Sequence, residues 1–401
     1  MGGKYSKALL LGSLAALPAG IVLIALSFWP GSGAMQPNGF YLGSDFVNYW
    51  MGGRLAVLDR VDVAYDLVAY NAQLREWFSP DIRMMNFSYP PHALLGLALF
   101  GALPYFVALI LWSVLGAAGF AGVALGRWPR REPALAAAMV LAPVIWVNIV
   151  FGQLGLWLAV LFVGALRALP TRPLLAGVLF GVLTIKPQLG LLLPLLLLAL
   201  GSWRVIAVAA ATVLVLAAAS AAAFGFEPWR AYISETMPFQ WQFIELMNGF
   251  YRFQMITPYT ALWFLGMPMR VALIGQAAIS SVIALTAFLV ARSSASWPLK
   301  CAVITFGSVL MVPYVLAYDL AVPFAALVWH LLDDRPAEEL GRVALVGALW
   351  ALPFGVAIMA QIHGIPLLPI ALLAAYFWLV AQALQWRVAR DVQSVLAATP
   401  S

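Results

Sequence analysis

Residues 204–224 read RVIAVAAATVLVLAAASAAAF, so a single arginine is followed by twenty residues without a charge. A helix of about 20 residues crosses the ~30 Å hydrocarbon core of a bilayer, and this stretch therefore predicts a membrane-spanning helix. The rest of the chain agrees, because 64% of its 401 residues are hydrophobic and only 9% are charged. A soluble domain carries about 25% charged residues. We expect an all-α polytopic membrane protein, and the single cysteine, Cys301, excludes a disulfide scaffold.

Eleven further apolar stretches are separated by short polar breaks, which predicts about twelve transmembrane helices in a single membrane-embedded domain over 1–401. Several stretches are shorter than a full crossing, and the shortest flank Gly152-Gln153 and Lys186-Pro187-Gln188. A short span is stable only where its polar end lies in a protein-lined cavity. The predicted spans are 8–29, 104–126, 134–151, 154–169, 173–186, 188–201, 204–224, 269–291, 298–316, 318–332, 342–361 and 366–386.

The distribution of charge predicts the orientation of these spans. An even number of spans places both termini on one side, which then carries fourteen Lys and Arg against six Asp and Glu. The other side carries eight against ten. Positive residues concentrate on the cytoplasmic side, so we expect both termini to be cytoplasmic. The net charge of +6 is then a topology signal and predicts no nucleic-acid partner.

Two segments on the outer side are too long and too aromatic for simple linkers, namely 30–103 and 225–268. We expect structured loops that lie on the membrane surface. Residues 92–103 are apolar, but twelve helical residues rise only about 18 Å. They predict a half-helix that dips into the outer leaflet.

Asp45 is the most informative acid of the first loop and lies in Gly43-Ser-Asp-Phe-Val-Asn-Tyr-Trp50. A carboxylate among aromatic residues at the membrane boundary has a raised pKa, which suits a general base that takes a proton from a hydroxyl. The alternative is a helix N-cap. Asp59, Asp62 and Asp66 lie further along the loop and predict turn and capping residues.

Phe87-Ser-Tyr-Pro-Pro-His92 supplies Tyr89 and His92 at the same boundary. A rigid turn explains the prolines, whereas His92 is a candidate for phosphate binding or proton transfer. Lys186 interrupts a long apolar run, and an intramembrane charge is a functional candidate; the alternative is a lysine that snorkels to the headgroups. Gln153 lies at the equivalent point of the preceding hairpin and predicts an inter-helix hydrogen bond or a pocket residue.

Later in the chain, Arg252 stands among aromatic residues in the second loop, where an arginine pairs with phosphate and stacks on rings. Its alternative role is interfacial anchoring. Asp319 is a candidate ion-pair partner for Lys186 or Arg252, and His363 at the last outer hairpin is a weaker pocket candidate. No Walker motif, dinucleotide fingerprint, HExxH or Cys/His cluster occurs in the sequence, so we expect neither a metal nor a cofactor.

These motifs together resemble glycosyltransferase family 87, the group also known as domain of unknown function 2029. The resemblance rests on Gly43–Trp50, Phe87–His92, Leu103-Pro104, Phe151-Gly-Gln153 and Ala176–Gln188. It implies the GT-C fold, an inverting transfer from a polyprenyl-phosphate sugar, usually mannose, and a lipid or glycan acceptor at the periplasmic face. It implies Asp45 as the catalytic aspartate of the first loop and Lys186 in the lysine-proline-glutamine turn that ends at Gln188.

The resemblance and the residues lead to one hypothesis. Asp45 deprotonates the acceptor hydroxyl, while Lys186, Arg252 and His92 hold the leaving phosphate, so one carboxylate suffices and no metal is needed. Tyr89, Gln153, Gln188, Asp319 and His363 are predicted to line the substrate pocket. The alternatives are a flippase or transporter of lipid-linked sugars and a polysaccharide ligase or polymerase. The alanine- and leucine-rich composition favours a bacterial inner membrane.

Overall fold

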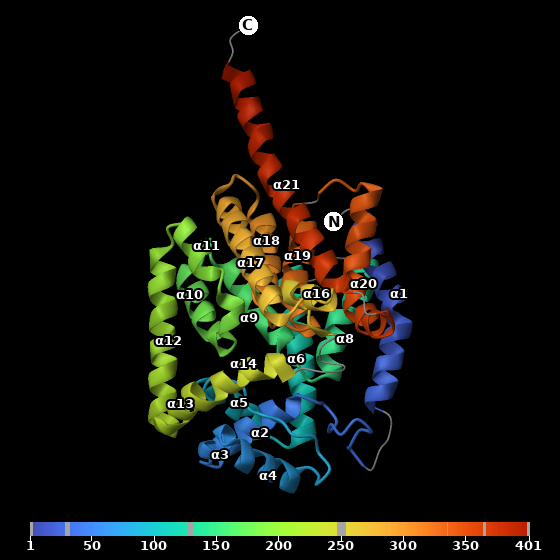
Figure 1. Cartoon of the computed structure of the whole chain (residues 1–401). Helices are drawn as coiled ribbons and strands as arrows, with labels where there is room; N and C mark the ends of the chain where they lie inside the picture. The colour runs from blue at the N-terminus through green and yellow to red at the C-terminus, as the bar shows by residue number, and fades with distance from the viewer. Residues whose placement is uncertain are drawn as a thin grey trace.

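The computed structural model describes residues 3–28, 33–126, 132–246, 254–334, 336–363 and 366–398. These residues form α-helices joined by turns, with two isolated β-bridges among them. Figure 1 shows a bundle of long helices with both termini at one end, and a layer of short helices across the other end. We call this layer, residues 33–104, the loop layer. It is formed by α2 (Phe46–Val57), α3 (Val61–Tyr65), α4 (Leu67–Trp77) and α5 (Ala93–Gly101).

The bundle is formed by the remaining helices, several of which are interrupted by prolines. In its first half these are α1 (Gly3–Phe28), α6 (Tyr105–Leu125), α7 (Pro133–Val140), α8 (Pro143–Val150), α9 (Gly155–Ala168), α10 (Pro173–Val182), η1 (Leu183–Ile185), η2 (Pro187–Gly190), α11 (Leu193–Ala199) and α12 (Trp203–Phe224). In its second half they are α16 (Pro258–Phe264), α17 (Met269–Arg292), α18 (Trp297–Leu310), η4 (Ala317–Leu320), α19 (Ala321–Asp333), α20 (Leu340–His363) and α21 (Leu367–Ala398). The segment formed by α13 (Glu227–Ala231), η3 (Tyr232–Thr236) and α14 (Met237–Leu246) instead lies across the end of the bundle, beside the loop layer (Figure 1).

Six segments of the described chain are long and apolar enough to cross a membrane, within a multi-pass membrane protein. The outer helix α12 illustrates the lipid-facing surface, because Leu214 and Val215 are 70% and 65% exposed. Such side chains are stable when surrounded by lipid rather than water. The six segments are Gly3–Val22, Tyr105–Leu125, Pro133–Val150, Trp203–Phe224, Met269–Arg292 and Leu367–Gln385.

Each of the twelve predicted spans contains helix, but a count of twelve full crossings is not confirmed. The predicted span 134–151 is broken into α7 and α8 where Pro143 begins the second helix. The predicted span 173–186 ends in the short turn η1, and the span 188–201 begins in the short turn η2; the two turns meet at Lys186. A proline cannot donate the hydrogen bond that would continue a helix. Hydropathy therefore predicts where these apolar stretches lie, but it does not show that each one crosses the membrane fully.

The loop layer is held together by two glycines where α2 crosses α5. A Cβ atom on Gly53 would lie 2.1 Å from the Leu97 carbonyl oxygen, and one on Gly101 would lie 2.1 Å from the Gly53 carbonyl carbon. The two backbones therefore touch only because both residues lack a side chain. With nine residues, α5 is about 13 Å long and too short to cross a bilayer, as predicted for 92–103.

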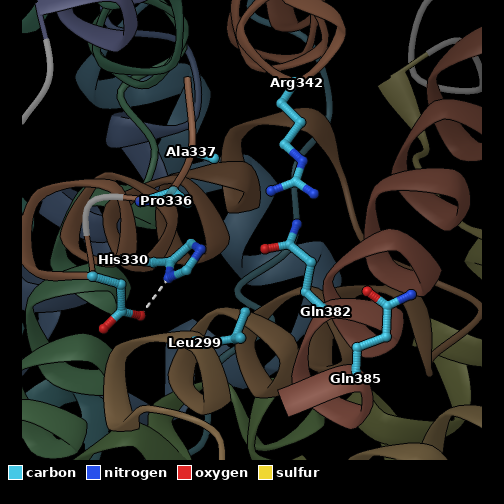
Figure 2. A pocket seen from close by; sticks show the side chains of 8 residues that line it. Leu299, His330, Pro336, Ala337, Arg342, Gln382 and Gln385 are labelled. Atoms are coloured by element: carbon cyan, nitrogen blue, oxygen red, sulfur yellow. Dashed lines mark hydrogen bonds and ion pairs between the residues drawn. The ribbon is translucent and has the colours of Figure 1, made fainter. Parts of the chain in front are cut away.

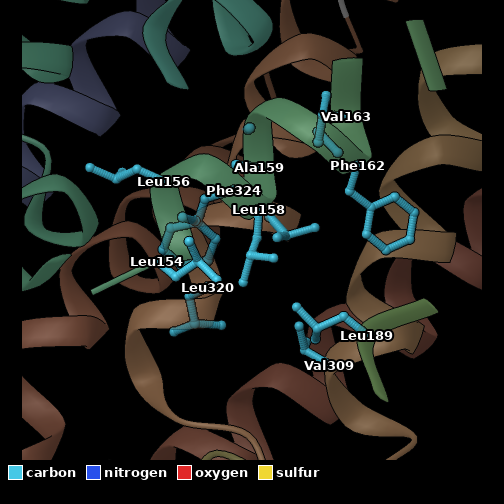
Figure 3. Packing of buried hydrophobic residues seen from close by; sticks show 14 of the residues in the cluster. Leu154, Leu156, Leu158, Ala159, Phe162, Val163, Leu189, Val309, Leu320 and Phe324 are labelled. Atoms are coloured by element: carbon cyan, nitrogen blue, oxygen red, sulfur yellow. The ribbon is translucent and has the colours of Figure 1, made fainter. Parts of the chain in front are cut away.

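The core of the bundle surrounds α9, which packs against α6, α10 and α19. Figure 3 shows Leu158 and Phe162 of α9 facing Leu189 and Val309, while Leu320 and Phe324 close the other side. Leu158 and Phe162 are fully buried, and burying one such side chain contributes about 1.5–3 kcal/mol. Since α9 begins at Gly155, this packing holds the preceding turn, Gly152-Gln153, in place above the loop layer.

Candidate functional site

A cavity of about 750 Å³ lies between the loop layer and the bundle. Its walls come from segments that are far apart in the sequence, including α2, the 83–89 segment, the α8–α9 turn, the Lys186 turn and the 312–318 segment. The polar and charged side chains that line it are Asp45, Asn48, Tyr49, Arg83, Asn86, Ser88, Tyr89, Gln153, Lys186, Gln188, Tyr232, Gln240, Tyr314 and Tyr318.

Asp45 reaches this cavity because the α8–α9 turn lies directly on the backbone before α2. The Asp45 amide donates to the Phe151 carbonyl oxygen at 3.1 Å. Next to it, Gly152 has a φ of +58°, and a Cβ atom there would lie 2.2 Å from the Gly43 carbonyl oxygen. Only glycine fits this left-handed position against another backbone, which explains the Phe151-Gly-Gln153 motif.

The side chain of Asp45 faces the cavity and does not cap its helix. Asp45 occupies the N-cap position of α2, yet its carboxylate accepts no hydrogen bond from the helix amides. The carboxylate instead accepts a hydrogen bond from the Gln153 side-chain amide. Burial raises the pKa of Asp45 to about 7, although the Gln153 hydrogen bond acts in the opposite direction. Asp45 therefore occupies the N-cap position, but its side chain does not cap the helix.

The predicted capping residues behave differently from Asp45. Asp66 caps α4, since its carboxylate accepts from the Val68 and Ala69 amides at 2.9 Å. Asp59 lies in a turn with a φ of +56°, and Asp62 lies in the first turn of α3. None of the three lines the cavity, so Asp45 is the loop-layer aspartate that the fold brings to it.

A chain of hydrogen bonds through Tyr89, Tyr49 and Gln153 leads to the Asp45 carboxylate. The Tyr49 hydroxyl donates to Gln153 Oε1 at 3.0 Å, which leaves Gln153 Nε2 directed at the Asp45 carboxylate. The Tyr89 hydroxyl lies 2.7 Å from that of Tyr49, and because the Tyr49 hydrogen is engaged, Tyr89 is the donor of this pair. Burial raises the pKa of Tyr49 well above its usual range, so the phenol keeps its proton. This chain of hydrogen bonds gives Gln153 a single orientation.

On the bundle side, Lys186 and Asp319 form a buried ion pair. Lys186 Nζ lies 2.6 and 2.7 Å from the two carboxylate oxygens of Asp319, and the side chains are 8% and 1% exposed. The ring of Tyr318 lies 5.1 Å from the same nitrogen. An ammonium group has three donors, and two of them serve Asp319. The predicted Lys186–Asp319 partnership is confirmed, and Lys186 points into the protein rather than snorkelling to lipid headgroups.

The remaining predicted site residues divide into three groups. Tyr89 and Gln188 line the cavity, as predicted. Asp319 was predicted to line it as well, but it is fully buried and reaches the cavity only through its ion pair with Lys186. His92 does not line it, since its ring stacks on Trp229 at 5.8 Å, and burial lowers its pKa to about 4. His92 is therefore neutral at pH 7, and we leave it out of the phosphate site. Arg252 and the side chain of His363 lie outside the described residues.

Several cavity residues were not predicted. Asn48 and Tyr49 lie within the Gly43–Trp50 motif. Tyr49 is four residues after Asp45, and this spacing places Asp45 and Tyr49 on one face of a helix. The spacing could therefore have indicated that Tyr49 lies at the site. Arg83 is an exposed lining residue that lies 5.4 Å from the ring of Phe40, and Tyr314 also lines the cavity. Neither has a sequence pattern that separates it from an ordinary interfacial residue.

The cavity thus combines a carboxylate, an ammonium donor and many hydroxyl and amide groups. A carboxylate with a pKa near 7 is a suitable general base at neutral pH, and an ammonium group stabilises developing negative charge on an oxygen. No group of three or more His, Cys, Asp or Glu side chains placed to hold a metal ion occurs in the described parts of the chain.

The fold and the cavity define a multi-pass membrane protein with a polar site where the loop layer meets the bundle. The model of glycosyltransferase family 87 matches residues 87–315, more than half of the chain, and the protein belongs to this family. Comparison with curated proteins and with solved structures returned no match. The matched region contains Tyr89, Gln153 and the Lys186 turn but begins after Asp45, so the assignment of Asp45 rests on its geometry.

Proposed function

We propose that the protein is an inverting glycosyltransferase that moves a sugar from a polyprenyl-phosphate donor to a hydroxyl of a lipid or glycan acceptor. Family membership supports the transferase class, and the family resemblance favours mannose. The observation that carries the proposal is one cavity with Asp45 on one wall and Lys186 on another. A donor with its lipid tail in the bilayer presents its phosphate at such a boundary between bundle and loop layer.

In the proposed reaction the acceptor hydroxyl gives its proton to the Asp45 carboxylate as its oxygen attacks C1 of the sugar. The bond between C1 and the phosphate oxygen breaks, and the electron pair leaves with the polyprenyl phosphate. The third N–H of Lys186 is available to that phosphate because Asp319 takes the other two. Arg83, an exposed residue that lines the cavity, and Arg252 are further candidates for binding anionic groups of either substrate.

The proposed chemistry needs no metal, since a phosphate is already a good leaving group and protein donors stabilise its charge. We expect sugar transfer to continue in the presence of a chelator. The topology proposed with this function places both termini in the cytoplasm and the cavity on the periplasmic side of a bacterial inner membrane. It follows from the charge distribution of the sequence.

Purified protein in lipid nanodiscs tests the proposal. Polyprenyl-phosphate mannose with a radiolabelled sugar is added together with a lipid extract as the acceptor pool. We expect label to move from the donor to a new lipid or glycan product, with and without EDTA. Donor binding without transfer to any acceptor pool would favour a transporter, and loss of transfer with EDTA would contradict the metal-free mechanism.

A further inference from the structure

A second cavity, of about 290 Å³, lies at the other end of the bundle from the proposed active site. It is lined by residues of α18, α19, the 336–337 segment, α20 and α21, namely Leu299, His330, Asp334, Pro336, Ala337, Arg342, Gln382 and Gln385. The first turn of α1 lies beside it, because the Tyr5 hydroxyl donates to the Ala337 carbonyl oxygen at 2.9 Å. The cavity is therefore at the end of the molecule that carries both chain termini (Figure 1).

His330 is the most unusual residue of this cavity. Its side chain is 3% exposed, and its Nδ1 lies 2.6 Å from an oxygen of Asp334, which also accepts from the Ser296 hydroxyl. Since a carboxylate only accepts hydrogen bonds, Nδ1 carries the hydrogen. The opposite ring nitrogen, Nε2, is buried and has no partner among the described residues, although a buried polar atom normally has one.

Gln382, on another helix, also has a buried polar atom without a hydrogen-bond partner among the described residues. This atom is the side-chain Nε2, which is a donor. Figure 2 shows His330 from α19, Arg342 from α20 and Gln382 from α21 converging on one space. Arg342 Nε pairs with Glu339 at 3.2 Å, and the rest of its guanidinium group lies towards Gln382 (Figure 2).

We propose that this cavity binds a phosphate group. The acceptor oxygens of a phosphate group satisfy Gln382 Nε2 and the terminal nitrogens of Arg342. Because Nδ1 of His330 carries the ring hydrogen, Nε2 is an acceptor, and it can accept a hydrogen bond from a hydroxyl of the same ligand. The space is far larger than the ~30 Å³ share of one water molecule. Among the nearby acids, Asp334 lines the cavity, and its carboxylate accepts from Ser296 and His330. One oxygen of Glu338 is also buried without a partner among the described residues, but neither Glu338 nor Asp333 lines the cavity.

The phosphate can belong to a phospholipid headgroup or to a free anion, and the chemistry of the cavity is the same for both. Pockets between helices at the cytoplasmic membrane surface can bind phospholipid headgroups, and Arg342 supplies a cationic side chain to the lining of this one. The experiment therefore has two arms. Delipidated full-length protein in a neutral detergent is titrated with radiolabelled inorganic phosphate in one arm and with short-chain phosphatidylglycerol in the other.

In both arms the proposed donor site lacks its buried cation, because its ion pair is replaced as a unit, Lys186→Met with Asp319→Asn. This keeps the result independent of the proposed transferase function. In that background we expect one phosphate-binding site per chain, and binding that is weakened about tenfold or more by Arg342→Ala and by Gln382→Leu, because each removes a hydrogen bond to a charged group. Arg204→Ala is the matched control, since it removes the same charge from an exposed position outside the cavity.

Binding of the phospholipid alone assigns a headgroup, and binding of inorganic phosphate alone assigns a free anion; both support the site. Saturable binding that Arg342→Ala and Gln382→Leu leave unchanged, or no binding of either probe, overturns it. Gln382 is only half-buried, so Gln382→Leu remains informative if Arg342→Ala fails to fold.

Discussion

At the scale of single residues, the site depends on how Gln153 presents its amide to Asp45. The Tyr89–Tyr49–Gln153 chain of hydrogen bonds orients a donor toward the carboxylate, and a donor stabilises the charged form of an acid. Gln153 is therefore proposed to act through Asp45 as a positioning residue. A substitution of Gln153 is therefore expected to change the pKa of Asp45, whereas loss of a group that contacts the sugar would not.

The pH dependence of transfer follows from the pKa of Asp45. Because burial raises this pKa to about 7, the carboxylate is protonated and inactive as a base below that pH, and we expect the rate to rise through pH 7 and then level off. Initial rates of transfer between pH 5 and 9 measure this profile. A rate that is constant from pH 5 to pH 8 would contradict the assignment of Asp45 as the base.

Gln153→Leu removes the hydrogen bond that stabilises the Asp45 carboxylate. We expect the rising limb of the pH–rate profile to move to higher pH by about one unit, which corresponds to roughly 1.4 kcal/mol. Tyr49→Phe keeps the Gln153 amide but removes its hydrogen-bond partner, along with the contact to Tyr89, and is expected to move the limb less. A lower rate at every pH with an unmoved limb would instead indicate that Gln153 contacts the substrate or only supports the fold.

The buried pair Lys186–Asp319 predicts opposite effects of single and double substitutions. Lys186→Ala leaves the Asp319 carboxylate buried without its cation, and breaking a buried pair in this way costs roughly 3–5 kcal/mol. Lys186→Met with Asp319→Leu removes both charges and is expected to recover the thermal stability in detergent while donor binding stays lost. Stability of the single variant equal to that of the native protein, or full donor binding by the double variant, would refute this role.

At the scale of elements, hydropathy predicted the positions of the helices well. Each of the twelve predicted stretches contains helix, and the breaks at Gly152 and Lys186 fall where the sequence places polar residues. The sequence could not reveal which breaks meet in space, because the Asp45–Gln153 and Lys186–Asp319 contacts join residues 108 and 133 positions apart. The α2–α5 contact could not be predicted either, because a glycine in a helix does not by itself indicate that another backbone packs against it.

The α2–α5 contact gives a matched pair of glycine substitutions within one helix. Gly101→Ala places a methyl group against the Gly53 backbone, and we expect it to cost about 1–3 kcal/mol and to lower transfer, because α2 follows Asp45. Gly96→Ala meets no atom within 4 Å and is expected to be neutral or slightly stabilising. Thermal unfolding of the two purified variants tests the difference; equal melting temperatures would show that α2 and α5 are not in backbone contact.

At the scale of the whole molecule, one end of the bundle carries the loop layer and the other carries both termini (Figure 1). The proposed active site and the proposed phosphate site therefore lie at opposite ends. The charge bias of the sequence predicts which end is which: the basic end faces the cytoplasm. Composition identified the class of protein and predicts an orientation, but it did not reveal the two cavities, whose walls come from helices that are distant in the sequence.

Cysteine labelling in intact cells tests this orientation. The single natural cysteine, Cys301, is buried and is replaced by alanine in the background. We expect a membrane-impermeant maleimide to label Asp62→Cys in the loop layer, while Arg204→Cys at the start of α12 reacts only after permeabilisation. Both positions are exposed, so the reverse pattern would invert the proposed topology.

The most direct test of the whole account is the rate of sugar transfer by Asp45→Asn in nanodiscs, with polyprenyl-phosphate mannose as the donor and Asp62→Asn as the control. Asparagine keeps the size of the side chain but cannot accept the proton, and loss of a general base lowers a rate roughly 10²–10⁴-fold. We predict a loss of this size with donor binding retained, and no loss for Asp62→Asn. Transfer by Asp45→Asn at the native rate would contradict the central claim.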